Sequence, residues 1–382
     1  MQQRKSIIWA TLATVILFTL GGWWYLAERT SQTPTTIKIG ALLPLTGKLA
    51  GYGEDVRNGI MLAQEELRER EVTVEIVFED SAGDPKVALS GTRKLIDIDK
   101  TPIVVGGPGS SAALAAAPLF EDGQTLFFPI SNASKLNEAG RYIFKLQHDV
   151  EFEMPVMVAH LLQNEQKEVG VFYDSSSESN VAGANAFRAE FEKAGGRVVL
   201  FDGFDGKSTN DFRTRLTHLK TLSPEALYLV TPGSSGGVIV KQARELGLST
   251  PAFGWSGLNG AEFFAGATVH ADGVVITDQP FSCAGMESTY CKRYDRKYTG
   301  RTPEQYGAHS YDIMLFLVDA FEKLNIEGPE IDENEKAKLI SYFTNRTLEG
   351  ASGRLRFDTN GNLRDKDFVF RIAEDGKFVD LK

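Results

Sequence analysis

The 382-residue chain is longer than one ordinary hydrophobic core, so its length favours two domains. An apolar fraction of 42% and a charged fraction of 24% are close to globular averages, which excludes collagen, coiled coil and wholesale disorder. The 51 acidic and 41 basic residues leave a net charge of -10, which opposes binding to nucleic acid. Two cysteines exclude a disulfide-stapled miniprotein and a four-cysteine zinc site.

The N-terminal segment carries a long apolar run. Residues 7–27 contain no charged side chain, and at about 1.5 Å per residue this length matches a hydrocarbon core of roughly 30 Å. Arg4 and Lys5 precede the run, so the positive-inside tendency places the folded body outside the cytoplasm. Because no small-residue cleavage site is obvious, we predict an uncleaved single-pass anchor and tether over residues 1–36; secretion after signal-peptide cleavage is the alternative.

After the tether, strand-like runs alternate with helical patterns. The predicted strands are IKIGALL at 37–43, VEIVFED at 74–80, PIVVGG and TLFFP, and the intervening helices include one whose Val56, Ile60, Ala63 and Leu67 share a face. Asp84-Pro85 predicts the capped start of a helix to about residue 97, and another helix begins near Ser110. This alternation predicts a mainly parallel, doubly wound sheet with its ligand crevice at the carboxyl ends of the strands.

A second α/β series begins near residue 150. Helices are predicted at 151–164, 180–194, 208–220 and 236–246, and they alternate with the strands EVGVFYD, RVVLF, ALYLV and PAFGW. Two such units predict two lobes with a cleft between them. The sequence pattern after this second series predicts helices at 287–298, 304–325 and 333–345. It then predicts the strands RLRFD, FVFRIA and KFVDL, joined by turns at Asn360-Gly361 and Asp375-Gly376.

The run Gly233-Ser234-Ser235-Gly236-Gly237 satisfies the GxSxG pattern of hydrolase nucleophile elbows and lies between a strand and a helix. A serine hydrolase using Ser235 is therefore one hypothesis, with Asp272 or Asp278 and His309 as the only loose candidates for its acid and base. No HGGG-type oxyanion loop accompanies the motif. The alternative is a turn of small residues whose backbone amides face the cleft.

The segment Gly107-Pro108-Gly109-Ser110-Ser111-Ala112 follows a strand and opens a helix. It resembles a dinucleotide fingerprint only weakly, because it follows the third strand and Pro108 removes a donor. Free amides at a helix start, together with two hydroxyl groups, predict a site for a carboxylate or similar group. Simple N-capping by Ser110 is the alternative.

Other candidate sites are weaker. The five histidines show no metal-ligand spacing. The Asp358–Asn362 segment lacks the glutamate that ends a calcium loop, so we expect a hairpin turn there. We expect the protein to bind no metal and no cofactor. Cys283 and Cys291 are close enough in sequence to form a disulfide in an oxidising compartment, and two reduced thiols are the alternative.

As an ordered set, the motifs IGALLPLTG, FEDSAGDP, VVGGPGSSAALAAAPLFED and FFPISNASKL resemble the type I periplasmic binding proteins of the leucine/isoleucine/valine-binding branch. The resemblance covers about residues 37–382. It implies two lobes joined by a three-strand hinge, with a ligand enclosed between them and usually handed to an ABC permease. The first lobe would take residues 37–149 and 279–355, and the second 150–278 and 356–382.

The same resemblance implies a set of ligand-binding residues. Ser110, aided by Ser111, would hold a ligand carboxylate, Ile130, Ser131 and Asn132 would contact it from the next turn, and Tyr52 would line the wall. The second lobe departs from the amino-acid-binding pattern. Ser256 stands where an acidic residue usually neutralises the ligand ammonium, Pro232 replaces a common aromatic residue, and Ser179 lies where another aromatic residue is missing.

These departures bear on the ligand, because burying an ammonium group without a carboxylate costs several kcal/mol. Either Glu178 or Asp205 supplies the charge from another position, or the ligand has no ammonium group. The leading hypothesis is a non-enzymatic extracytoplasmic receptor that clamps a small polar, carboxylate- or amide-bearing ligand for an ABC permease. A membrane-anchored sensing receptor is the alternative, and the Ser235 hydrolase is the third.

Overall fold

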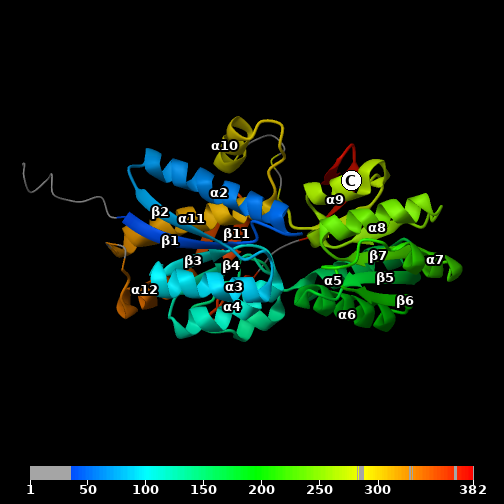
Figure 1. The fold of residues 1–382 in the computed structure, drawn as a ribbon, viewed down its shortest axis with the longest axis horizontal. Coiled ribbons are helices and arrows are strands. Elements are labelled where there is room, and N and C mark those ends of the chain that lie inside the picture. Colours follow the sequence, from blue (N-terminus) through cyan, green and yellow to red (C-terminus); the bar gives the residue numbers. More distant parts are fainter. Residues whose placement is uncertain are drawn as a thin grey trace, which may run out of the picture.

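The computed structural model describes residues 36–281, 283, 288–326, 328, 330–364 and 368–381. Within these ranges the chain forms two α/β lobes side by side (Figure 1). The anchor predicted at residues 7–27 lies outside the described residues. In the part of the chain that the structure describes, we find no helix both long and apolar enough to cross a bilayer.

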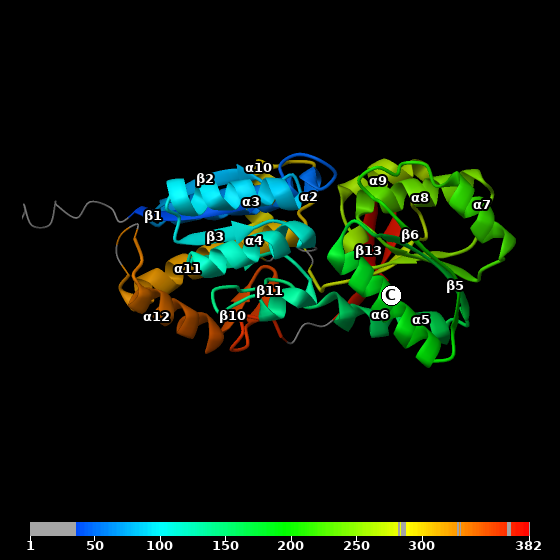
Figure 2. The ribbon, with the colours of Figure 1, turned by 60° about the horizontal axis from the view of Figure 1, so that its bottom comes forward.

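The first lobe is built on a four-stranded parallel sheet in the order β2-β1-β3-β4. Its strands are β1 (Thr36–Leu43), β2 (Thr73–Asp80), β3 (Ile103–Gly106) and β4 (Leu126–Pro129). Helices α2 (Ala50–Glu69) and α11 (Gln305–Leu324) cover one face, and α3 (Pro85–Arg93) and α4 (Ser110–Asp122) cover the other (Figures 1 and 2). The lobe also contains α10 (Thr289–Lys297), α12 (Glu333–Thr344) and the antiparallel pair β10 (Thr347–Gly350) and β11 (Gly353–Arg356).

Local signals in the sequence account for the helices beside this sheet. The predicted apolar face of α2, from Val56 to Leu67, is buried in the core. Helix α3 begins at Pro85 as predicted, because the Asp84 carboxylate accepts a hydrogen bond from the Lys86 amide at 2.9 Å. Gly59 lets α2 approach α11 closely, since a Cβ atom there would lie 2.0 Å from the Gly307 carbonyl oxygen.

The second lobe is built on a seven-stranded sheet in the order β13-β12-β9-β8-β7-β5-β6. The parallel strands are β5 (Glu168–Asp174), β6 (Arg197–Phe204), β7 (Ala226–Val230), β8 (Ala252–Gly254) and β9 (Val275–Asp278); β12 (Val369–Glu374) and β13 (Lys377–Asp380) are antiparallel. Helices α8 (Gly233–Glu245) and α9 (Ala261–Ala267) lie on one face, and α5 (Val150–Gln163) and α6 (Glu178–Lys193) on the other (Figure 1). Helix α7 (Arg213–Thr221) contacts α8.

The chain passes between the lobes three times. The first passage lies between Leu146, which packs in the first core, and Val150, which packs in the second. The second lies between Asp278, which ends β9 of the second lobe, and Phe281, which packs in the first core. The third follows Leu363, which packs in the first core, and precedes β12 of the second sheet. The third passage is therefore later than the predicted division after residue 355.

One predicted strand pairing is wrong, although the predicted hairpin turn at Asn360-Gly361 does form. The strands RLRFD and FVFRIA are not paired across Asn360-Gly361, because β11 pairs with β10 in the first lobe while β12 pairs with β9 and β13 in the second. The turn instead closes a bridge between Phe357 and Leu363, and the Gly361 carbonyl accepts a hydrogen bond from the Lys145 amide at 2.9 Å. The Asp375-Gly376 turn does join β12 to β13, as predicted.

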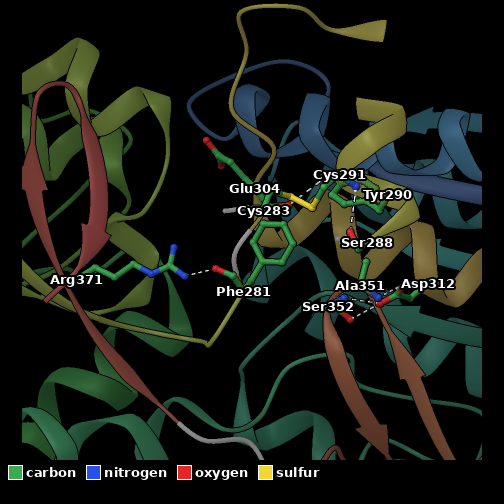
Figure 3. Close-up of a disulfide and its surroundings, with 10 residues drawn as sticks. All are labelled: Phe281, Cys283, Ser288, Tyr290, Cys291, Glu304, Asp312, Ala351, Ser352 and Arg371. Carbon is green, nitrogen blue, oxygen red and sulfur yellow. Dashed lines mark hydrogen bonds between the residues drawn. A yellow bond between two sulfur atoms is a disulfide. The ribbon is translucent and has the colours of Figure 1, made fainter. Parts of the chain in front are cut away.

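Arg371 on β12 ties the second and third passages together. Its guanidinium lies 3.2 Å from Asp278 at the end of β9 and donates a hydrogen bond to the Phe281 carbonyl (Figure 3). Both charged side chains are buried, with 8% of Arg371 and 1% of Asp278 exposed. Close to this point, Cys283 and Cys291 form a disulfide that ties the chain after the second passage to α10 (Figure 3).

We expect Arg371→Met to lower the free energy of unfolding by about 3–5 kcal/mol, because it leaves the Asp278 carboxylate buried without its partner. Adding Asp278→Asn removes that stranded charge and restores much of the loss. Chemical denaturation measures both effects. Arg354→Met breaks an exposed pair with Glu349 and serves as a control that changes stability by less than about 1 kcal/mol. Equal losses in the single and double variants would contradict this role for Arg371.

Candidate functional site

A cavity of about 330 Å³ lies between the two lobes. All of its lining residues except Gln147 and Tyr306 follow the carboxyl end of one of the eight parallel strands β1 to β8, either at the strand end, in the turn after it or in the first turn of the next helix. From the first lobe these are Gly47, Lys48, Leu49, Tyr52, Ala82, Gly83, Asp84, Pro108, Gly109, Ser110, Ser111, Ile130, Ser131 and Asn132. From the second lobe they are Asp174, Ser176, Ser177, Ser179, Asn180, Gly206, Lys207, Pro232, Ser234, Ser235, Trp255 and Gly257. The cavity therefore occupies the crevice predicted from the alternation of strands and helices.

The turn between β3 and α4 forms the centre of the first wall. Gly109 precedes the helix with φ of 133°, a backbone conformation that favours glycine, and no side chain caps the helix start. Ser110 is the first residue of α4 and not its cap, so the capping alternative is wrong. Its hydroxyl instead lies 3.1 Å from the Ser131 hydroxyl in the next turn. Free amides and two serine hydroxyls are thus gathered at one helix start.

Residues of the two lobes make direct contact around the cavity. The Ser179 hydroxyl at the start of α6 donates a hydrogen bond to the Ser110 hydroxyl at 2.8 Å. The Ser111 hydroxyl accepts one from the Glu178 amide at 3.3 Å. The Tyr52 hydroxyl accepts a hydrogen bond from the Gly233 amide at 2.9 Å and donates one to the Gly257 carbonyl at 3.1 Å. The structure thus has the lobes closed upon each other.

Two lysines cross between the lobes in opposite directions. Lys207 of the second lobe forms an ion pair with Asp84 of the first at 2.8 Å. Lys48 of the first lobe donates hydrogen bonds to the Gly206 carbonyl and, at 3.2 Å, to the Asn210 side chain of the second. Both lysines line the cavity. Because each lysine belongs to one lobe and its partners to the other, these contacts form only when the lobes are closed.

The structure brings together eight of the nine predicted ligand-binding residues. The eight that line the cavity are Tyr52, Ser110, Ser111, Ile130, Ser131, Asn132, Ser179 and Pro232. No sequence motif pointed specifically to Lys48, Asp174, Lys207, Trp255 or Tyr306, which also line the cavity. Asp174 and Trp255 do follow the general rule that sites form at strand ends, whereas Tyr306 comes from α11, for which no local signal pointed to the cleft.

Ser256 is the exception and does not line the cavity. Its amide and hydroxyl donate hydrogen bonds to the two carboxylate oxygens of Glu153, at 2.6 and 2.8 Å, and the Thr277 hydroxyl donates a third. Only 1% of Glu153 is exposed, and this burial raises its pKa to about 7 despite the three donors. Ser256 therefore faces a buried carboxyl group of α5 behind the cavity wall.

The two alternative sources of negative charge also lie off the cavity lining. Glu178 forms an ion pair with Lys135 of the first lobe at 3.1 Å. The Asp205 carboxylate accepts hydrogen bonds from the Ser208 hydroxyl and the Lys207 amide, which lower its pKa. Protein groups thus hold the Asp205 carboxylate and one oxygen of Glu178, whose other oxygen, Oε2, is buried without a hydrogen-bond partner among the described residues.

Ser235 lines the cavity, but the described residues do not form a catalytic triad around it. The His309 ring is 3.3 Å from the Gln279 side chain, and Asp278 is held by Arg371. Among the hydrogen bonds of the described residues, none joins the Ser235 hydroxyl to a histidine or a carboxylate. The GxSxG run is therefore the turn of small residues that opens α8.

Comparison with known proteins identifies the family. Residues 36–377 match the family model described as periplasmic binding protein. The chain belongs to this family. It is 24% identical, over 91% of its length and 94% of the relative's, to Leu/Ile/Val-binding protein homolog 3 of Brucella melitensis biotype 1. The sequence-based identification of a type I periplasmic binding protein of the leucine/isoleucine/valine-binding branch is confirmed.

Solved structures of other family members show the same fold. A leucine-binding protein of Thermotoga maritima matches with a TM-score of 0.81 and 24% identity, over 91% of this chain and 98% of that one. An R. palustris solute-binding protein in complex with benzoate matches with a TM-score of 0.80 and 18% identity, over 91% and 95%. This periplasmic binding protein is a solute-binding receptor and not an enzyme, so the Ser235 hydrolase hypothesis is excluded.

We expect Glu153 to make the stability of the protein depend on pH. Because its folded-state pKa of about 7 exceeds the usual value of 4.5, its contribution is complete below about pH 4.5 and is lost as pH rises through 7. The variant Glu153→Gln stays uncharged. Its free energy of unfolding relative to the parent protein should therefore rise by about 1–3 kcal/mol between pH 4.5 and 8.

Denaturant titrations at both pH values measure this difference. Glu192→Gln on the exposed face of α6 is the control, and its stability relative to the parent should barely change with pH. A constant difference for Glu153→Gln would show that Glu153 is not a buried acid with a raised pKa.

Proposed function

We propose that this protein clamps a small polar solute, bearing a carboxylate or amide group, between its lobes and delivers it to an ABC permease. The observation that carries the proposal is the closed cavity to which helix starts and serine hydroxyls contribute from both lobes. The names of two relatives support it, since one is a Leu/Ile/Val-binding protein homolog and the other is the solute-binding protein of an ABC transporter. Delivery predicts that deleting the gene abolishes uptake of the ligand; unchanged uptake with a lost cellular response would favour the sensing alternative.

The start of α4 would hold the acidic end of the ligand. The first-turn amides point out of the helix, and the aligned peptide dipoles favour a negative group there by about 0.3–1 kcal/mol. The hydroxyls of Ser110, Ser131 and Ser179 are already gathered at this point. Each can turn its proton toward a carboxylate, and such charge-assisted hydrogen bonds are roughly twice as strong as neutral ones.

The positions of the three serine hydroxyls explain why a bound ligand would close the two lobes. Ser110 and Ser131 belong to the first lobe and Ser179 to the second, so a ligand in contact with all three bridges the cleft. A ligand shifts an equilibrium only by its difference in affinity for the two states. Contacts with Ser179 and the neighbouring α6 start exist only when the lobes are closed, and they would drive rotation about the three passages.

The apolar run at residues 7–27 supports export of the body, and we propose that it remains as a membrane anchor. The intact mass of the protein extracted from membranes with detergent measures this directly. We expect a mass that includes residues 1–27. A mature chain that begins near residue 28 would show that the segment is a cleaved signal peptide.

Ser110→Ala should weaken binding of the ligand about tenfold, because one charge-assisted hydrogen bond contributes roughly 1.5 kcal/mol. The ligand that copurifies with the protein is identified by mass spectrometry, and its affinity is measured by isothermal titration calorimetry. Ser90→Ala on the exposed side of α3 is the matched control and should leave affinity unchanged. Unaltered affinity in Ser110→Ala would show that the acidic end of the ligand does not bind at the start of α4.

A further inference from the structure

The wall that the second lobe presents to the cavity favours negatively polarised groups. Helices α6 and α8 both begin at the cavity, and neither start, at Ser177 or at Pro232, is capped by a side chain. A helix start carries partial positive charge and free amides. The α4 start faces them from the first lobe. A ligand in this cavity thus meets helix starts on both sides.

One buried donor on this wall has no acceptor among the described residues. The Asn180 side chain lines the cavity in the first turn of α6, only 2% of the residue is exposed, and its Nδ2 atom makes no hydrogen bond to the part of the chain that the structure describes. A buried amide without an acceptor is costly, so this side chain indicates where a ligand acceptor would lie. An ammonium group has only protons to offer and cannot fill that role.

Both carboxylates of the cavity lining accept hydrogen bonds from protein groups. Asp174 accepts three at its Oδ1 atom, from the Ser176 amide at 2.8 Å, the Ser176 hydroxyl at 2.6 Å and the Gly206 amide at 2.9 Å, whereas no hydrogen bond among the described residues reaches its Oδ2 atom. Asp84 caps α3 and pairs with Lys207. The positive charges of Lys48 and Lys207 balance these two negative charges, and the helix starts then make the lining positive in sum.

Three further carboxyl groups lie near Tyr306 and outside the cavity lining. Glu153 holds Ser256 and Thr277, Asp278 pairs with Arg371, and Glu304 accepts a hydrogen bond from the Ala261 amide at 3.0 Å. None of the three lines the cavity. They are occupied by protein donors and are not placed to receive a ligand ammonium group.

We propose that the ligand is a small organic acid without an ammonium group, an oxo acid or a dicarboxylate, whose far end accepts a hydrogen bond from Asn180. This inference rests on the proposed function and narrows its ligand class. The carboxylate lies at the start of α4, and a carbonyl or second carboxylate lies against the starts of α6 and α8. The same wall rejects α-amino acids, because their ammonium group would meet helix starts and the Asn180 donor in a buried site.

The test compares acids with the amino acids of the same carbon skeleton, using the full chain and isothermal titration calorimetry. The pairs are 4-methyl-2-oxopentanoate with leucine, 2-oxoglutarate with glutamate, and succinate with aspartate. We expect at least one acid to bind, and to bind at least tenfold more tightly than its amino counterpart. Tighter binding of an amino acid, abolished by Asp174→Asn, would overturn the inference and leave the proposed function standing. No binding by any of the six compounds would overturn the inference, whereas the proposed function is tested separately with the ligand that copurifies with the protein.

A substitution at Asn180 tests the assigned contact. Asn180→Asp places a negative charge where the acceptor should lie, so affinity for the acid should fall at least tenfold while affinity for the matched amino acid stays or rises. Gln163→Glu adds the same charge on the exposed side of α5 and should leave both affinities unchanged. Equal acid affinity in Asn180→Asp and Gln163→Glu would overturn the role of Asn180, with circular dichroism confirming that both variants are folded.

Discussion

The site depends on one constraint, that the parallel strands of both sheets direct their carboxyl ends toward the same cleft. Several of the βα turns then deliver the start of a helix to that cleft, and the starts of α4, α6 and α8 carry no side-chain cap. The residues that follow all eight strands β1 to β8 supply almost the whole lining of the cavity. The binding chemistry is therefore largely backbone chemistry, and the side chains that refine it are short hydroxyl and amide groups at helix starts.

The hinge uses ionisable groups differently from the cavity. Arg371, Asp278 and Glu153 lie where the chain passes between lobes, and each is buried among protein partners. At the edge of the cavity, the Lys207–Asp84 pair and the Lys48 contacts are partly exposed and join the two lobes. Rigid, buried contacts thus fix the pivot, whereas weaker exposed contacts can break and reform as the lobes move.

Much of the fold was predictable from the sequence, because alternation of apolar runs with helical periodicity is a local signal. The Asp84-Pro85 helix start is an example. The partner of β11 was not predictable, since the Asn360-Gly361 turn specifies a reversal of the chain without specifying the next sheet. In the site, resemblance placed Ser110 and Ser131 at strand ends. It could not show that Ser256 hydrogen-bonds the Glu153 carboxylate, because Glu153 lies 103 residues earlier in the chain.

The lobes, the hinge and the converging helix starts lead to a single central claim, that one small solute touches both lobes with its acidic end at α4. A crystal structure of the protein with the ligand it retains on purification tests this most directly. The account predicts a carboxylate or equivalent oxygen within hydrogen-bonding distance of the Ser110 or Ser111 amide, and another ligand atom within reach of the α6 start. A ligand that contacts one lobe only, or that leaves the start of α4 to solvent, would contradict it.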